Sequence, residues 1–247
     1  MKIQVAIQTH YFQRRLCWML SSILDQEDLP EDLEIEASIA YVENTGNPTT
    51  EAVIDFFRSE GLLIRACPYP DTSDFQYRGW TRNRQLDESD ADWIIFADSD
   101  MVYPKDFFSV LYNKVTTDYK DNPHCLYSRR YSTELDPTTA LVDTNDNYPM
   151  RIQGAFERSH VLPGKLKRNI GAGYFQLANV PLLKKNHGYY QKPGKKIDWS
   201  WDSKHQKAKS DMHFRSMLGR EAINLPLQVH LQHVRDSDVG THIEAQR

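Results

Sequence analysis

The stretch Trp93-Ile-Ile-Phe-Ala-Asp-Ser-Asp100 places two carboxylates, Asp98 and Asp100, directly after an unbroken apolar run. Such a run is typical of a strand buried on both faces, as in a parallel sheet covered by helices. The chain has 22 aspartates and three Asp-x-Asp spacings, close to the number that chance would produce. The position of this pair after a buried strand, rather than its spacing, makes it a candidate site.

The segments around this stretch alternate between strand-like and helix-like patterns. This alternation predicts a single α/β domain over residues 1–247, with a mostly parallel, Rossmann-like central sheet flanked by helices. Ligands of such sheets bind at the carboxyl ends of the strands, where Asp98 and Asp100 lie. The predicted strands are 2–8, 33–43, 62–66 and 92–97, and the predicted helices begin near Arg14, Thr49 or Thr50, Gly79 and Pro104.

The second half of the chain has weaker patterns. Turn residues with little periodicity occupy about 132–168, which predicts a functional loop. A strand is expected over 173–180, a helix over 207–219 that ends at Gly219, and a last strand over 225–234.

Two neighbouring carboxylates raise each other's pKa unless a cation lies between them. Hard oxygen ligands favour Mg²⁺ or Mn²⁺, with substrate phosphates completing the coordination sphere. Asp98 and Asp100 are therefore predicted to bind one of these metals. The alternative is a capping turn without a metal.

Cysteine content and hydropathy bear on location. The three cysteines are too few and too scattered for a disulfide framework, which favours the cytoplasm. The first apolar segment is too short for a signal peptide, and no window approaches the roughly 18 apolar residues of a membrane helix. Export and membrane spanning are not expected.

The net charge of -4 hides a division along the chain. Residues 1–150 carry a net charge of -13, whereas residues 151–220 carry +11. Clustered cations interleaved with aromatic rings favour a phosphate backbone and unstacked bases. A solvated basic face, an anionic lipid surface or an acidic polysaccharide would account for the same pattern. The candidate acceptor-binding residues in this segment are Arg168, Trp199, Trp201 and Lys204.

Several motifs, in order, resemble those of GT-A nucleotide-sugar glycosyltransferases, in particular family 2. The family has a turn after its first strand, acidic residues after its second, an Arg-Asn pair before a strand that ends in Asp-x-Asp, an acceptor-side strand, and a late helix. The matching segments here are IQTHYFQR (7–14), VENTGN (42–47), GWTRNRQLDESDADWIIFADSD (79–100), GAGYFQLAN (171–179) and KSDMHFRSMLG (209–219). The resemblance covers most of residues 3–233.

This resemblance implies roles on the donor side. Thr9 would line the nucleotide pocket, Glu43 would accept a hydrogen bond from the base or ribose, and Arg82 would lie near the diphosphate. Asp98 and Asp100 would hold Mn²⁺ or Mg²⁺ on the diphosphate of a nucleoside diphosphate sugar, most simply a UDP-sugar. The family's third metal ligand would be His230, with His233 as its rival, and a regular strand would direct only one of them to the metal.

On the acceptor side, the resemblance implies that Asp211 is the catalytic base, which gives inversion at the anomeric carbon. A carboxylate in this position accepts the proton of the acceptor hydroxyl as the new bond forms. The family's acidic residue before the base is Ser210 here, and Asp202 is a credible substitute. Residues 1–118 would form the donor half and residues 119–247 the basic acceptor half.

The acceptor itself is open. Some phage enzymes transfer sugars to hydroxymethylated pyrimidines in DNA, and a compact chain with a basic acceptor half would suit that work, with the target base flipped out of the duplex. A polysaccharide, a lipid-linked acceptor or a small glycan is the alternative. Two other functional classes are alternatives. One is a nucleotidyltransferase, but this sequence lacks the glycine-rich loop expected of that class. The other is a non-catalytic nucleic-acid-binding module.

Overall fold

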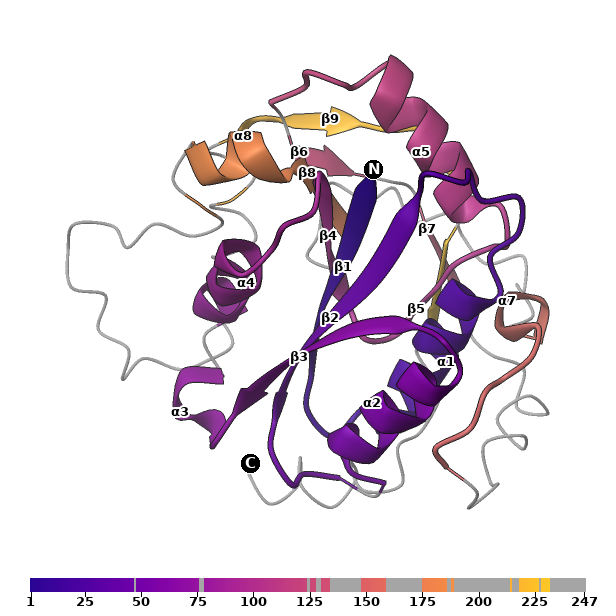
Figure 1. The fold of residues 1–247 in the computed structure, drawn as a ribbon, viewed down its shortest axis with the longest axis vertical. Coiled ribbons are helices and arrows are strands. Elements are labelled where there is room, and N and C mark those ends of the chain that lie inside the picture. Colours follow the sequence, from indigo (N-terminus) through magenta and orange to yellow (C-terminus); the bar gives the residue numbers. More distant parts are fainter. Residues whose placement is uncertain are drawn as a thin grey trace.

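The computed structural model describes most of the first half of the chain and separate segments of the second half (Figure 1). The described residues are 1–46, 48–75, 78–123, 125–127, 130–133, 148–158, 175–185, 188, 214, 218–226 and 228–231.

The centre of the fold is a seven-stranded mixed sheet in the order β3-β2-β1-β4-β8-β6-β9. Its first four strands are parallel, whereas β8 is antiparallel to both β4 and β6. The predicted α/β architecture is therefore confirmed. The strands are β1 (Lys2–Thr9), β2 (Glu34–Val42), β3 (Leu63–Tyr69), β4 (Trp93–Asp98), β6 (Cys125–Tyr127), β8 (Phe175–Asn179) and β9 (Arg220–Ala222).

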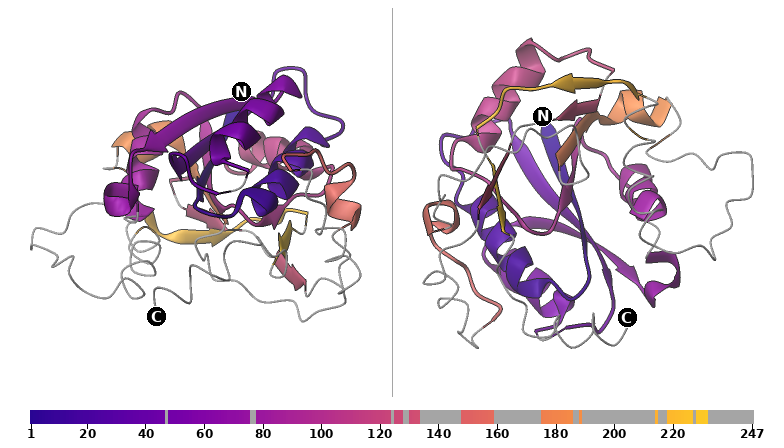
Figure 2. Two further views of the ribbon diagram at one scale, coloured as in Figure 1. Left: turned by 90° about the horizontal axis from the view of Figure 1, so that it is seen from below. Right: turned by 180° about the vertical axis from the view of Figure 1, so that it is seen from behind.

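Helices cover both faces of this sheet, with α1 and α2 on one face and α4 on the other (Figures 1 and 2). The apolar run of β4 explains the arrangement. Ile95 packs in the larger core beside α1 and α2, and Ile94 and Phe96 pack in a second core with α4 and α8. The helices are α1 (Gln13–Leu24), α2 (Thr50–Ser59), α3 (Thr72–Phe75), α4 (Arg78–Asp87), α5 (Phe107–Thr117), α7 (Ala155–Arg158) and α8 (Val180–Lys185).

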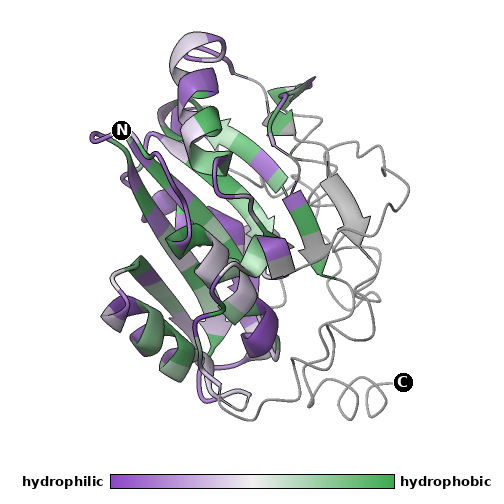
Figure 3. Cartoon of the chain, turned by 90° about the vertical axis from the view of Figure 1, so that its right-hand side faces the viewer, coloured by the Kyte–Doolittle hydropathy of each residue, from purple (hydrophilic) through white to green (hydrophobic). Residues whose placement is uncertain are grey.

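The strands of the central sheet carry many apolar residues, as the hydropathy colouring of the ribbon shows (Figure 3). Local signals agree with this packing. The hydroxyl of Thr49 accepts a hydrogen bond of 3.3 Å from the Ala52 amide and so caps α2. Among the described residues, every helix is too short or too polar to span a lipid bilayer.

A second sheet, in the order β5-β10-β7, brings the late part of the chain to the Asp-x-Asp turn. The amide of Leu231 donates a hydrogen bond of 2.8 Å to the Asp100 carbonyl. The strands of this sheet are β5 (Met101–Val102), β7 (Arg130–Thr133) and β10 (Gln228–Leu231).

The structure departs from the sequence-based expectation in the second half. The helix α7 lies within the segment predicted as a loop, and the strand β7 overlaps the start of that segment. The strands β5, β6 and β9 have no predicted counterpart. These strands are short, so periodicity does not reveal them. Gly219 has a φ of 73°, as expected at a helix end. Most of the predicted helix 207–219 lies outside the described residues.

Candidate functional site

Asp98 and Asp100 lie at the carboxyl edge of the parallel strands, as predicted. Asp98 is the last residue of β4 and pairs in register with Gln8, the penultimate residue of β1. Both side chains remain partly accessible, at 29% exposure for Asp98 and 16% for Asp100. The two carboxylates are therefore within reach of a ligand while being shielded from bulk water.

Two arginines of α4 neutralise Asp98. Nη2 of Arg78 lies 3.0 Å from Oδ1 of Asp98, and Nη2 of Arg82 lies 3.8 Å from the same oxygen. Arg82 is 1% exposed, donates a hydrogen bond of 3.1 Å to Oε1 of Gln176, and lies 5.5 Å above the Phe96 ring. Arg82 therefore supports Asp98 from inside the protein, whereas Arg78 lies at the accessible side.

A third arginine, from α1, pairs with the other carboxylate. Nη1 of Arg15 lies 3.5 Å from Oδ2 of Asp100. Its guanidinium group also lies 4.9 Å from the centre of the Phe12 ring. Each carboxylate of the Asp-x-Asp motif thus has a cation of the chain beside it.

Beneath this edge lies a fully buried phenol, Tyr103. Its ring packs between Phe107 and Phe108, with centroid distances of 4.6 and 5.4 Å. Burial, together with the negative charge of Asp98, raises the pKa of Tyr103 far above its ordinary value. A buried aromatic cluster therefore lies close to Asp98. Charge interactions on the side of Asp98 that faces this cluster are weakly screened.

The predicted nucleotide-binding residues lie at the ends of β1 and β2. Thr9 ends β1, and its buried hydroxyl has no hydrogen-bond partner within the described part of the chain. The ring of His10 lies 5.7 Å from that of Phe75, whose carbonyl accepts a hydrogen bond of 2.6 Å from Gln8 Nε2. Glu43 is exposed directly after β2, at the same edge of the sheet.

Of the remaining predicted site residues, only His230 lies in the part of the chain that the structure describes. The backbone of His230 pairs with Met101, one residue after Asp100. No group of three metal-binding side chains occurs among the described residues. Near β4, the Phe214 ring packs edge-on against Phe96 at 5.7 Å. Outside the described residues lie Arg168, Trp199, Trp201, Asp202, Lys204, Asp211 and His233.

Four residues beside the two carboxylates were not predicted from the sequence: Arg15, Arg78, Gln176 and Tyr103. Arg15 and Arg78 lie in helices that were predicted. Helical periodicity identifies the buried apolar residues of a helix, but it does not show which carboxylate a long arginine side chain contacts. Gln176 meets Arg82 only because β8 is antiparallel to β4, a pairing that the sequence did not predict.

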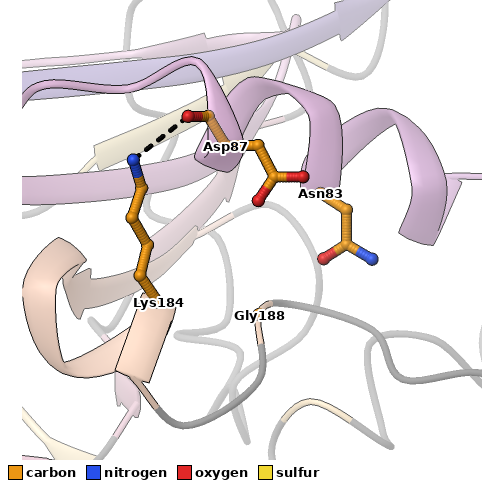
Figure 4. A pocket seen from close by; sticks show the side chains of 4 residues that line it. All are labelled: Asn83, Asp87, Lys184 and Gly188. Carbon is orange, nitrogen blue, oxygen red and sulfur yellow. Dashed lines mark hydrogen bonds between the residues drawn. The ribbon is translucent and has the colours of Figure 1, made fainter.

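A separate cavity of about 310 Å³ lies between α4 and α8, and its lining includes neither Asp98 nor Asp100 (Figure 4). Nζ of Lys184 donates hydrogen bonds of 3.1 and 2.7 Å to the carbonyls of Asp87 and Ser89. Lys184 therefore stabilises the carboxyl end of α4. The described lining residues are Asn83, Asp87, Lys184 and Gly188.

Solved structures with the same fold are glycosyltransferases and related proteins. TarS 1-349 of S. aureus matches with a TM-score of 0.61 and 13% identity, over 93% of this chain and 60% of that one. Its complex with UDP-GlcNAc matches with a TM-score of 0.60 and 16% identity, over 97% and 61%. The mannosyltransferase PcManGT from Pyrobaculum calidifontis, in complex with GDP-Man and Mn²⁺, matches with a TM-score of 0.56 and 17% identity, over 92% and 56%.

The chain thus spans about three fifths of the length of the TarS 1-349 structures, and the shared architecture is the GT-A fold. No curated protein matches the sequence. The model of "Glycosyl transferase family 2" matches residues 15–172. Because this match extends over more than half of the sequence and includes the Asp-x-Asp strand, the chain belongs to glycosyl transferase family 2.

Proposed function

We propose that this protein is a metal-dependent, inverting glycosyltransferase that moves a sugar from a nucleoside diphosphate sugar to an acceptor hydroxyl. The observation that carries the proposal is the placement of Asp98 and Asp100 at the carboxyl edge of the sheet, with arginines beside them. This arrangement offers both ligands for a cation and cations for a diphosphate.

The donor would bind across this edge. The guanidinium groups of Arg78 and Arg15 are suited to bidentate contacts with phosphate oxygens. Thr9 and Glu43, at the ends of β1 and β2, would contact the nucleoside. A TarS structure contains UDP-GlcNAc and the PcManGT structure contains GDP-Man, which supports a nucleotide-sugar donor, and we propose a UDP-sugar.

The donor set fits a divalent cation. Asp98 and Asp100 supply hard carboxylate oxygens, and His230, whose backbone pairs with Met101 beside Asp100, is proposed as a third ligand with His233 as the alternative. Mn²⁺ or Mg²⁺ held there would stabilise the negative charge that develops on the departing nucleoside diphosphate. The Mn²⁺ in the PcManGT structure supports this assignment.

We propose Asp211 as the base that accepts the proton of the acceptor hydroxyl, with Asp202 as the alternative. Asp211 stands three residues before Phe214 in the sequence, and the ring of Phe214 contacts Phe96 of β4. Removal of the proton on the face opposite the leaving group would give inversion. A base of this kind typically contributes about 10² to 10⁴ in rate.

The acceptor is proposed to be anionic, because residues 151–220 carry a net charge of +11. Arg168, Trp199, Trp201 and Lys204 would contact it. DNA with hydroxymethylated pyrimidines is one proposed acceptor of this kind, on the basis of the charge and size of the chain. A polysaccharide or lipid-linked acceptor with negative charges would meet the same surface, and transfer assays with each acceptor would separate them.

A thermal-shift panel of nucleoside diphosphate sugars with Mn²⁺ tests the donor and metal assignments. A donor at 100 times its Kd would stabilise the wild type by about 2.7 kcal/mol. Asp100→Ala is expected to abolish this shift and the transfer activity while the protein stays folded. The matched control is Asp90→Ala, from the same Asp-x-Asp spacing at the other end of β4, which should keep the donor-induced shift. A flat panel with the wild type would overturn the proposal.

The competing classes differ in product and in requirements. Pyrophosphate as the released product, instead of a nucleoside diphosphate, would identify nucleotidyl transfer. Steeply salt-dependent DNA binding without a need for Mn²⁺ or a nucleotide sugar would identify a binding module.

A further inference from the structure

The charges around the Asp-x-Asp motif do not favour a free metal ion. Asp98 and Asp100 bring two negative charges, and the guanidinium groups of Arg15, Arg78 and Arg82 beside them bring three positive charges. These groups together carry a net positive charge. A divalent cation that arrives alone is therefore repelled, whereas the negative charges of a donor diphosphate reverse the sign of the total.

Arg15 is the arginine of this set that bears on Asp100. Its Nη1 lies 3.5 Å from Oδ2 of Asp100, and the two side chains are only 20% and 16% exposed. Partly buried pairs are screened by salt much less than surface pairs. A cation bound to Asp100 must compete with this guanidinium group or displace it.

We propose that Arg15 is a resident counter-cation of Asp100 that makes metal binding depend on the donor. The inference rests on the metal site of the proposed function. Without a donor, Arg15 neutralises Asp100 and weakens its affinity for a metal ion. When a diphosphate is present, the guanidinium group gains phosphate oxygens as partners, and Asp100 is released to the cation. Arg15 is thus a positioning residue that couples two ligands.

The coupling is measured by titrating the full chain with Mn²⁺ and following free Mn²⁺ by electron paramagnetic resonance, without and with UDP. In the wild type, UDP is expected to tighten Mn²⁺ binding by at least about tenfold. Arg15→Gln should bind Mn²⁺ alone about tenfold more tightly than the wild type, and UDP should change its affinity less. Arg15→Lys keeps the positive charge and should restore the wild-type behaviour.

A matched control is Arg58→Gln, which removes a guanidinium group from an exposed ion pair of similar length, 3.6 Å, on α2. It should leave both Mn²⁺ affinities unchanged. The inference is overturned when Arg15→Gln binds Mn²⁺ like the wild type, when Arg15→Lys behaves like Arg15→Gln, or when UDP leaves the wild-type affinity unchanged. The last measurement needs no variant and so does not depend on the folding of Arg15→Gln.

Failure of the proposed function has a different signature. In that case neither the wild type nor Arg15→Gln binds Mn²⁺ better than Asp100→Ala, with or without UDP. Wild-type binding that is lost in Asp100→Ala but is insensitive to Arg15→Gln would instead reject only the role of Arg15.

Discussion

At the scale of single residues, the site is a pair of carboxylates whose negative charges are exceeded by the positive charges of the arginines beside them. Asp98 has Arg78 and Arg82 beside it, and Asp100 has Arg15. Arg82 differs from the others because it is buried and shared with Gln176. A buried cation that loses its partner is costly, so Arg82 and Asp98 stabilise the fold as a pair as well as shaping the site.

Replacing Arg82 is therefore expected to lower the stability strongly. Arg82→Met would remove the hydrogen bond to Oε1 of Gln176 and the second of the two arginines beside Asp98. Loss of one partner of a buried pair costs about 3–5 kcal/mol, and the partial exposure of Asp98 reduces this to about 2–3 kcal/mol. Urea unfolding measures the change in the free energy of unfolding.

The control for this variant is Lys114→Met, which removes an exposed ion pair with Asp118 at the end of α5 and should cost less than about 0.5 kcal/mol. Equal losses for Arg82→Met and Lys114→Met would contradict the structural role of Arg82. In the double variant of Arg82→Met and Asp98→Asn, the loss in the free energy of unfolding should be smaller than the sum of the two single losses. The reason is that the two side chains share one interaction.

A site residue can be predicted from the sequence when the secondary structure that carries it also determines its position. Asp98 and Asp100 could be predicted because a buried strand carries them to a sheet edge known for ligands. Thr9 and Glu43 could be predicted at the same edge because they stand at the carboxyl ends of β1 and β2. Arg15, Arg78 and Gln176 could not, because their partners are distant in sequence and depend on side-chain conformation and on an antiparallel strand.

At the scale of elements, helix α4 connects the fold with the site. It carries Arg78 and Arg82, and it is held on the sheet by Gln85, which is fully buried. Nε2 of Gln85 donates hydrogen bonds of 3.1 Å to the carbonyl of Ile7 and 2.8 Å to that of Ser38. One side chain thus fixes α4 against both β1 and β2.

Gln85→Leu should therefore affect stability and donor affinity together. Loss of these buried hydrogen bonds is expected to cost about 1–3 kcal/mol. Because displacement of positioning groups by ~1 Å has large effects, the donor KM should rise on the order of tenfold. Urea unfolding and steady-state kinetics measure the two effects.

The control is Gln26→Leu, since Gln26 similarly bridges the carbonyls of Ser22 and Pro104, both at 2.8 Å, but does not contact α4. It should lower the stability and leave the donor KM within about twofold of the wild type, a change of under ~0.5 kcal/mol. An unchanged KM in Gln85→Leu would separate the position of α4 from donor binding.

The elements themselves were predicted with uneven success, for a physical reason. The longer strands and helices of residues 1–118 were predicted because each has the periodicity of its type and buries a complete face, whereas the four-residue helix α3 was not predicted. The strands β5, β6, β7 and β9 are too short to show a period, and their pairing partners lie far away in the sequence. The mixed character of the seven-stranded sheet follows from β8, which is antiparallel to both β4 and β6.

At the scale of the whole molecule, the two edges of the parallel sheet have different tasks. The carboxyl edge holds the candidate site. The amino edge holds an ion network in which Nζ of Lys2 lies 2.8 Å from Glu36 and 2.9 Å from Asp90, while Arg65 lies 2.8 Å from Asp90. Another Asp-x-Asp spacing, Asp90 and Asp92, lies at this edge, where Asp92 accepts a hydrogen bond of 2.8 Å from the Lys2 amide. Identical spacings at the two ends of one strand thus lie in different surroundings, one in an ion network and the other in the candidate site.

This separation predicts a pH-dependent stability that does not affect donor binding. Hydrogen bonding from Lys2 lowers the pKa of Asp90 below its ordinary value of 3.8. A carboxylate whose pKa is lower in the folded state stabilises the protein above its unfolded pKa, and this contribution is lost as the pH falls through the folded pKa. Asp90→Asn should therefore be less stable than the wild type at neutral pH, and the difference should vanish toward pH 2.

The side chain of Asp90 is 67% exposed, so the deficit at neutral pH should be less than about 1 kcal/mol. Urea unfolding from pH 7 to pH 2 measures it, with the exposed Asp121→Asn as the control, and the thermal shift produced by donor and Mn²⁺ should equal that of the wild type. A deficit that stays constant with pH would assign the effect to packing rather than to charge. A weaker donor-induced shift would show that the two edges of the sheet are coupled.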